Sequence, residues 1–396
     1  MLNRTYTDML QEKDVIFEIF HFALKRAAEI GADNVYDFSL GNPSVSPPPA
    51  VAEAITGALA ELPPLALHGY SPSFGRPEAR AAVAEQLNRR YGCHYGPEHV
   101  FITGGAASAL AHAFRAVGVP GQEIVTFAPC FSEYRPYTAG AGLKLNVVPA
   151  RSEDFQIDFA ALEERLSERT AAVLINSPNN PSGAVYSTAT VRRLAELLTA
   201  KAKELGRPLY LISDEPYRDI IFPGTDSPYI AGLYPNTLTC YSYSKSLSLP
   251  GERIGYLAVN PECADGQKII EICPQISRTI GHNGAASLFQ QVIVRAGGGT
   301  ADLSVYQRNR DVLCQALPEL GFALVPPGGS FYMFPRCPEE DDLAFCRQAR
   351  EHDIMLVPGS VFSCPGHFRL AFCVPTQRVE QALPAFRELA RSYGLV

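Results

Sequence analysis

Apolar positions along the chain recur in two different patterns, which predict strands and helices in alternation. Amphipathic stretches with apolar residues three to four positions apart, such as 106–117 and 190–205, indicate helices. Short, continuous apolar runs lie before or after them, at residues 99–103, 123–127, 143–148, 171–176, 209–213, 238–242 and 254–259. Continuous apolar strands that alternate with helices are typical of a mostly parallel sheet covered on both faces. We therefore predict an α/β fold with a seven-stranded sheet sandwiched by helices.

The pattern changes near residue 290, which predicts a second, smaller domain. Two long helical patterns, near 283–297 and 300–318, lead into short predicted strands at 322–325, 331–334, 354–357 and 368–372. A last helix is predicted near 376–393. An amphipathic stretch at 15–30 can join this part of the chain. We predict a large α/β domain over residues 46–290 and a discontinuous α+β domain formed by residues 1–45 and 291–396.

Composition and charge exclude several classes of protein. The 396 residues are 46% hydrophobic and 19% charged, which is enough apolar material for a large core. The net charge of -7 argues against a nucleic-acid binder, and no apolar stretch reaches the ~18 residues of a membrane helix. The ten cysteines are scattered without a CxxC pair, and no metal-site spacing is present. We therefore expect a cytoplasmic protein with reduced thiols and no bound metal.

Small, polar and charged residues follow several of the predicted strands, at the sheet edge where ligands of open α/β folds bind. These residues are Gly105, Ala106, Ala107, Asp214, Ser242, Lys245 and Arg253. A helix start with small residues, a hydroxyl group and an arginine suit a phosphate dianion. A lysine beside such a site and a carboxylate suit a Schiff base to an aldehyde cofactor whose ring nitrogen pairs with the carboxylate. The patterns GxxxxGK[ST] and GxGxxG after an early strand are absent, so the layout favours a pyridoxal-phosphate enzyme.

These residues belong to an ordered set of motifs that resembles the class I/II aminotransferases of fold type I, in the aspartate aminotransferase superfamily. The motifs are Ser39-Leu40-Gly41-Asn42-Pro43, Tyr70 with Gly75, Asn179-Asn180-Pro181-Ser182-Gly183, Asp214-Glu215-Pro216-Tyr217, Ser242-Tyr243-Ser244-Lys245, Gly251-Glu252-Arg253-Ile254-Gly255 and Phe368-Arg369-Leu370. Each motif alone is weak. The set follows the family's order over nearly the whole chain, so it is specific.

The resemblance implies pyridoxal 5'-phosphate as the cofactor and a role for each matching residue. Lys245 would form the Schiff base and carry the proton of the substrate's Cα, while Asp214 would pair with the ring nitrogen. Hydrogen bonds to the ring's 3-oxygen would come from Asn180 and Tyr217, and Phe131 would stack on the ring. The phosphate would be held by Gly105, Ala106, Ala107, Ser242, Arg253 and, from the neighbouring subunit, Tyr70. A residue contributed by a neighbour implies a homodimer.

The resemblance also implies the reaction. Arg369, with Gly41 and Asn180, would bind the substrate's α-carboxylate. The enzyme would move an amino group from an L-amino acid to a 2-oxo acid, with 2-oxoglutarate expected as acceptor, by a ping-pong mechanism. Two departures stand out: Phe131 occupies a position where many relatives have tryptophan or tyrosine, and Arg278 is the one candidate for binding a second substrate carboxylate. The identity of the amino donor stays open.

Simpler interpretations exist for each residue. Lys245 could lie in a surface loop, Asp214 could cap a helix, and Arg253 or Arg369 could form structural ion pairs. Tyr70 and Phe131 could be core aromatics. Two other functions use the same cofactor residues: a β-elimination lyase and a pyridoxal-phosphate-sensing regulator. The regulator is disfavoured, since the family pattern starts near residue 36 and leaves no room for a DNA-binding module.

Overall fold

The computed structural model describes residues 2, 4–9 and 15–396, and the chain divides into two compact units. The smaller unit contains the chain up to residue 42 with residues 305–326 and 331–396, and the larger unit contains residues 43–304 and 327–330. The sequence predicted boundaries at 45/46 and 290/291. Residues 43–45, 291–304 and 327–330 therefore lie in the larger unit and not, as was expected, in the smaller one. For residues 291–304 the reason is that α12 (Ser287–Ala296) buries Val292 and Ile293 in a cluster with residues of α3 (Pro49–Glu61) and α5 (Pro77–Tyr91).

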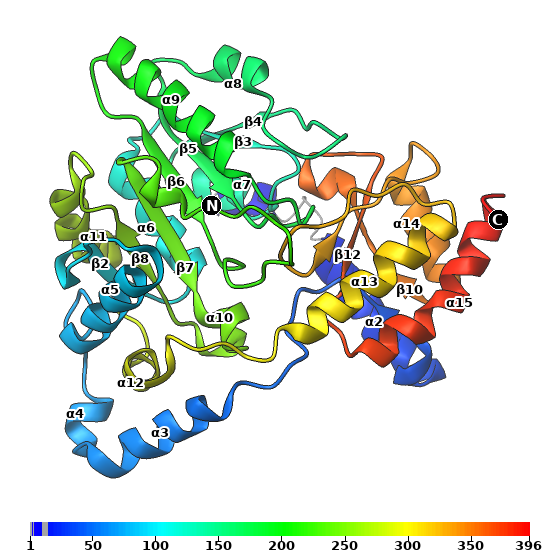
Figure 1. The fold of residues 1–396 in the computed structure, drawn as a ribbon, viewed down its shortest axis with the longest axis horizontal. Coiled ribbons are helices and arrows are strands. Elements are labelled where there is room, and N and C mark those ends of the chain that lie inside the picture. The colour runs from blue at the N-terminus through cyan, green and yellow to red at the C-terminus, as the bar shows by residue number, and fades with distance from the viewer. Residues whose placement is uncertain (1, 3, 10–14) are drawn as a thin grey trace. The chain divides into compact units, whose positions relative to one another are not determined.

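The larger unit is built on a seven-stranded sheet with the strand order β2-β8-β7-β6-β5-β3-β4 (Figure 1). Its strands are β2 (Val100–Thr103), β3 (Glu123–Phe127), β4 (Lys144–Val148), β5 (Thr170–Asn176), β6 (Tyr210–Asp214), β7 (Thr237–Ser242) and β8 (Gly255–Val259). The pairs from β4 across to β7 are parallel, and β8 runs antiparallel to both of its neighbours. The predicted mostly parallel seven-stranded sheet is therefore confirmed.

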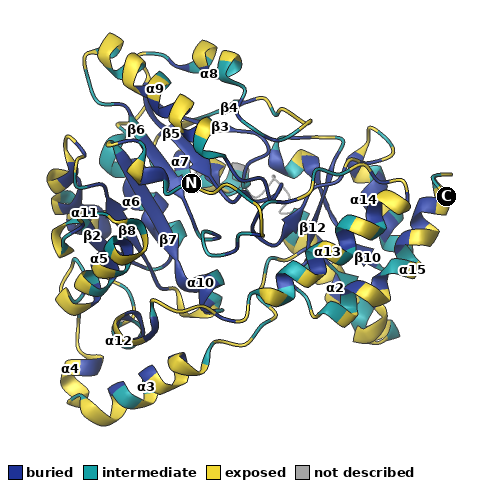
Figure 2. Cartoon of the chain, viewed as in Figure 1, coloured by how far each residue is buried: buried dark blue, intermediate teal, exposed yellow. Residues whose placement is uncertain are grey.

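Helices cover both faces of this sheet, which explains why its strands are almost continuously apolar. The remaining helices of the unit are α4 (Pro64–His68), α6 (Ala106–Val117), α7 (Tyr134–Ala139), α8 (Phe159–Arg165), α9 (Thr188–Leu205), α10 (Tyr243–Ser246) and α11 (Gly266–Ile280). On one face Leu174 and Ile212 pack in a cluster with α6 and α11, and on the other face Val173 and Leu211 pack in a cluster with α8 and α9. Successive residues of one strand point to opposite faces, so both faces need apolar side chains. The central strands are buried along their length (Figure 2).

The smaller unit combines helices with two small sheets. Its elements are α1 (Arg4–Met9), α2 (Val15–Ile30), β1 (Tyr36–Asp37), α13 (Ser304–Glu319), β9 (Tyr332–Met333), α14 (Asp342–Glu351), β10 (Ile354–Met355), β11 (Val357–Pro358), β12 (Phe368–Ala371) and α15 (Thr376–Ser392). The sheets are β1-β10 and β11-β12-β9. The predicted strand at 322–325 is wrong: these residues have no strand partner, and the buried Phe322 instead packs edge-on against Phe345 and Phe368.

Short 3-10 turns complete the chain at Ala32–Asn34, Pro97–His99, Ile230–Gly232, Pro250–Glu252 and Gly359–Phe362. In the part of the chain that the structure describes, no helix has both the length and the apolar character to span a membrane. Within the same residues, no group of three or more histidine, cysteine or acidic side chains is arranged to hold a metal ion.

Candidate active site

Asp214 ends β6 and is a buried carboxylate at the sheet edge. Its side chain is buried, and Oδ2 accepts a hydrogen bond of 2.6 Å from the Tyr134 hydroxyl. Oδ1 is also buried and has no hydrogen-bond partner among the described residues. The pKa of Asp214 is raised to about 7, because burial, with a smaller contribution from the neighbouring Glu215, outweighs the Tyr134 hydrogen bond, which lowers it. A buried carboxylate oxygen without a donor needs one, and a protonated ring nitrogen would supply it.

Asn180 lies at the same sheet edge because a second asparagine ties its loop to β6. Asn176, the last residue of β5, donates from Nδ2 to the Asp214 carbonyl at 2.8 Å. Its Oδ1 accepts from the Asn180 backbone N–H at 2.7 Å. Asn180 is buried, and so is Tyr217, three residues beyond Asp214. These bonds hold the loop after β5 against the end of β6, so Asn180 and Asp214 belong to one site.

Lys245 lies in the short helix α10, directly after β7. Asp214 pairs in register with Cys240 of β7, so the residues after Ser242 continue past the edge where β6 ends. Ser242 caps α10, since its Oγ accepts from the Ser244 backbone N–H at 3.2 Å. Lys245 itself is half-buried. The topology therefore places the predicted nucleophilic lysine and the buried carboxylate at the same edge of the sheet.

The start of α6 forms a cradle with room for an anion. Gly105, with φ of +85°, precedes Ala106, the first residue of the helix. A Cβ atom on Gly105 would lie 3.1 Å from Nη2 of Arg253, closer than an ordinary contact, and the positive φ also favours glycine here. The helix start offers backbone N–H groups, and the guanidinium adds a positive charge. This arrangement fits a phosphate group, as the sequence predicted for Gly105, Ala106, Ala107 and Arg253.

Two further side chains near this edge escaped the sequence analysis. Tyr134 lies three residues after Phe131, and the two rings pack edge-to-face with centroids 5.7 Å apart. His282 lies close to the cradle: a Cβ on Gly104 would be 3.1 Å from its Cε1, and its Nδ1 is 2.9 Å from the Ser108 hydroxyl. Phe131 and Tyr134 are aromatic residues three positions apart after β3, and this spacing could have indicated that Tyr134 lies near the site. No local signal marks His282, which is distant in sequence from the cradle.

Arg369 and Gly41 lie together in the smaller unit. Arg369 is buried in β12 and donates from Nη2 to the Ser39 carbonyl. Its guanidinium lies over the rings of Tyr332 and Phe362, at 4.9 and 4.8 Å from their centroids. Gly41 packs so closely on the Tyr332 hydroxyl that an added Cβ would overlap with it. Aromatic faces and a carbonyl thus hold the guanidinium rigidly, as recognition of a carboxylate requires.

Two of the predicted residues lie on the surface. Tyr70 is fully exposed, so within one chain it holds nothing. Arg278 is exposed on α11 and donates to Gln275 at 3.2 Å. The structure therefore gives no support to Arg278 as a residue that binds a second substrate carboxylate.

The family model for aminotransferase class I and II matches residues 33–386. The chain belongs to this family. An aspartate aminotransferase of Thermotoga maritima is 32% identical over 82% of this chain and 84% of that protein. An aspartate/prephenate aminotransferase of Thermus thermophilus is 31% identical over 89% of this chain and 90% of that one. The crystal structure of an aminotransferase from Eubacterium rectale superimposes with a TM-score of 0.96 at 44% identity, covering 100% of this chain and 99% of that chain.

Membership confirms the expected fold, enzyme class and cofactor. The protein is an aminotransferase with amino acid and 2-oxo acid substrates, and enzymes of this family use pyridoxal 5'-phosphate. The described residues fit that cofactor, because Asp214 Oδ1 is a buried acceptor without a donor and the cradle at Gly105 has space that a Cβ would fill.

Proposed function

We propose that this aminotransferase uses Lys245 as its nucleophile and proton carrier, with Asp214 as the partner of the cofactor's ring nitrogen. The observation that carries the proposal is the unpartnered, buried Oδ1 of Asp214 at the sheet edge from which the Lys245 helix starts. An isolated buried carboxylate is costly. A cationic ring nitrogen would offset that cost, which gives the residue a function in the loaded enzyme.

The other residues hold and tune the cofactor. When bound, the cofactor supplies an electron sink for the electron pair left by breaking the Cα–H bond. The Lys245 amine takes up that proton and returns it, and Asn180 and Tyr217 hydrogen-bond to the ring's 3-oxygen. The phosphate dianion would be held by Ser242, Arg253 and the backbone N–H groups of Gly105, Ala106 and Ala107, and Phe131 would stack on the ring.

The resemblance to the family assigns the substrate's α-carboxylate to Arg369, Gly41 and Asn180. A bidentate bond between the guanidinium and the α-carboxylate fixes the direction of the Cα–H bond, which decides the bond that breaks. The acceptor is 2-oxoglutarate. Aspartate heads the donors to test, because two of the relatives above are named for it, and aromatic, branched and small amino acids complete the panel. Each donor is scored by the rate of its half-reaction with the loaded enzyme.

The lysine assignment is tested by reductive trapping. Enzyme saturated with pyridoxal 5'-phosphate is treated with borohydride and digested, and mass spectrometry locates the modified lysine. We expect label at Lys245, and we expect Lys245→Ala to lose both turnover and visible absorbance while keeping its fold. Lys268→Ala, which changes an exposed lysine of α11, is the matched control. Label elsewhere, or near wild-type turnover by Lys245→Ala, contradicts the assignment. Release of pyruvate and ammonia without a keto acceptor would identify a lyase instead.

We also propose a cytoplasmic homodimer in which Tyr70 reaches the phosphate of the partner subunit. The support is the full exposure of Tyr70 next to other exposed apolar residues, Leu65 at 90% and Leu59 at 53%. Subunit mixing tests this proposal. Tyr70→Ala and Lys245→Ala homodimers should both be poor enzymes, yet their mixture should regain activity, because one hybrid site combines an intact lysine with an intact tyrosine. Absence of complementation in proven hybrid dimers contradicts it.

A further inference from the structure

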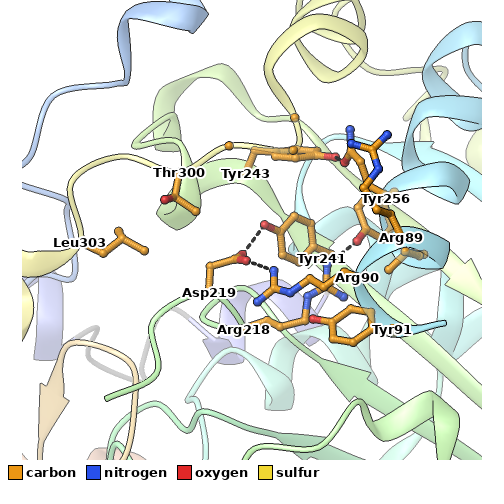
Figure 3. A pocket seen from close by; sticks show the side chains of 15 residues that line it. Arg89, Arg90, Tyr91, Arg218, Asp219, Tyr241, Tyr243, Tyr256, Thr300 and Leu303 are labelled. Carbon is orange, nitrogen blue, oxygen red and sulfur yellow. Dashed lines mark hydrogen bonds and ion pairs between the residues drawn. The ribbon is translucent and has the colours of Figure 1, made fainter. Parts of the chain in front are cut away.

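Behind the lysine helix lies a cavity of about 400 Å³ whose walls are rich in tyrosine and arginine (Figure 3). We call it the tyrosine cavity. Its side-chain lining includes Arg90, Arg218, Asp219, Tyr241, Tyr243 and Tyr256. A loop of the larger unit, residues 297–300, closes another part of the wall. None of these side chains has a role in the function proposed above.

A continuous chain of polar contacts runs along this wall to the lysine helix. Arg90 forms an ion pair with Asp219. Asp219 Oδ2 accepts from the Tyr241 hydroxyl at 2.6 Å, and 2.8 Å separates that hydroxyl from Ser246 Oγ. Figure 3 shows the first two links as dashed lines around the Tyr241 ring. This series of polar contacts ends at Ser246 on α10, one residue after Lys245.

The Tyr241 hydroxyl is the donor at the centre of these contacts. Burial raises the pKa of Asp219, but the charges of Arg218 and Arg90 and the Tyr241 hydrogen bond outweigh it, so the pKa lies below its usual value. Asp219 is therefore ionised and can only accept. The Tyr241 hydroxyl lies within donating distance of two acceptors, Asp219 Oδ2 at 2.6 Å and Ser246 Oγ at 2.8 Å. This one hydroxyl therefore links the ionised carboxylate to α10.

The Tyr241 ring is held on three sides, which fixes the position of its hydroxyl. The ring stacks on Tyr256 at 4.9 Å and packs edge-on against Tyr243 at 5.1 Å. The Arg218 guanidinium lies 4.3 Å from its centroid. Arg218 is itself anchored by Glu215 at 3.1 Å and by the Tyr256 hydroxyl at 2.6 Å.

The helix that this chain reaches cannot stabilise itself. α10 has four residues, Tyr243–Ser246, fewer than one cooperative helical segment requires. Ser246 is fixed at two atoms, because its carbonyl also accepts from the Ala301 backbone N–H at 2.7 Å. We propose that Tyr241 is a positioning residue for Lys245: the Arg90–Asp219–Tyr241–Ser246 chain sets the rotation of α10 and hence the direction of the lysine amine. This proposal rests on the role of Lys245 proposed above.

A double-mutant cycle tests the proposal with the full-length enzyme. Tyr241→Phe and Ser246→Ala each remove one hydroxyl of the chain. Tyr243→Phe is the control: Tyr243 is the first residue of α10, but its hydroxyl donates to Gln86 at 3.3 Å and takes no part in the Arg90–Asp219–Tyr241–Ser246 contacts. The readouts are the dissociation constant of pyridoxal 5'-phosphate and the pH midpoint of the visible absorbance of the lysine-bound cofactor.

We expect Tyr241→Phe and Ser246→Ala each to weaken cofactor binding about fivefold, the usual net effect of one hydrogen bond. Each should shift the absorbance midpoint, the double variant should be no weaker than either single one, and Tyr243→Phe should behave like wild type. The proposal is overturned if the increases in the cofactor dissociation constant multiply in the double variant. It is also overturned if Tyr241→Phe and Tyr243→Phe shift the absorbance midpoint equally. If wild-type enzyme is not trapped at Lys245, the proposed function fails instead. In that case the same double-mutant cycle, measured as the thermal stability of the cofactor-free protein, still decides whether the Tyr241 and Ser246 hydroxyl groups are coupled.

Discussion

The hydroxyl of Tyr134 donates to Oδ2 of Asp214 at 2.6 Å, while Oδ1 of the same carboxylate has no donor among the described residues. The protein thus satisfies one oxygen and leaves the other for a ligand. Tyr134 is itself buried at the start of α7, so its hydroxyl can move little. A carboxylate with a purely structural or capping role would have donors for both oxygens. The free Oδ1 of Asp214 instead suits a positively charged ring nitrogen.

Tyr134→Phe should raise the pKa of Asp214, because it removes the hydrogen bond that lowers that pKa. Cofactor binding at pH 8 should weaken about fivefold, the effect of one hydrogen bond, and a titration followed by visible absorbance measures it. Tyr186→Phe, which removes another buried tyrosine hydroxyl, is the control. Unchanged affinity in Tyr134→Phe would show that the bond does not act on Asp214.

Asp214→Asn should change how the stability of the cofactor-free protein depends on pH. The folded-state pKa of about 7 lies above the unfolded value, ~3.9. The folded protein therefore binds more protons between these values, and its stability falls as pH rises through that window. Asp214→Asn should remove this fall and make the cofactor-free protein more stable than wild type at pH 8. Chemical denaturation from pH 4 to pH 8 measures it, and parallel curves for both proteins would contradict it.

Gly255→Ala should displace Gly105 and so weaken phosphate binding at the start of α6. The added Cβ would overlap with the Tyr241 carbonyl oxygen and lie 2.9 Å from the Cα of Gly105, and neither backbone atom can move aside freely. Overpacking of this kind costs ~1–3 kcal/mol of stability, and affinity for inorganic phosphate and for the cofactor should fall with it. Gly251→Ala is the matched control, since nothing lies within 4 Å of its Cβ. Equal stability of the two variants would contradict the packing.

Arg369→Lys should raise KM for amino donors more than it lowers kcat. Lysine keeps the charge but loses the bidentate fork and the stacking over Tyr332. A loss of ~2 kcal/mol in carboxylate binding corresponds to about thirtyfold in kcat/KM. Steady-state kinetics with the best donor measure it, and Arg336→Lys, an exposed arginine of the same unit, is the control. Equal KM values for both variants would place the substrate carboxylate elsewhere.

Prediction from sequence succeeded where the signal is local and repeated. The apolar runs correspond to the seven strands because a strand covered on both faces is apolar at most of its positions. The run at 322–325 looked similar but lacks a pairing partner, so Phe322 serves the core from an irregular segment. The apolar pattern at 322–325 therefore predicted the burial of Phe322 correctly but its secondary structure wrongly. The boundary predicted at 290/291 differs from the observed one at 304/305, because α12 packs on helices that are distant in sequence.

The sequence by itself determined the order of strands and helices, the sheet edge where ligands bind, and the residue types that suit pyridoxal phosphate, because spacing and motif order are properties of the chain. The tertiary structure alone decided which partner each residue meets. Tyr134 is 80 residues from Asp214, and Asp219 meets Tyr241 only because β6 and β7 are neighbours. Hydrogen bonds and desolvation depend on distances of a few ångströms between such segments, and no local pattern in the sequence encodes those distances.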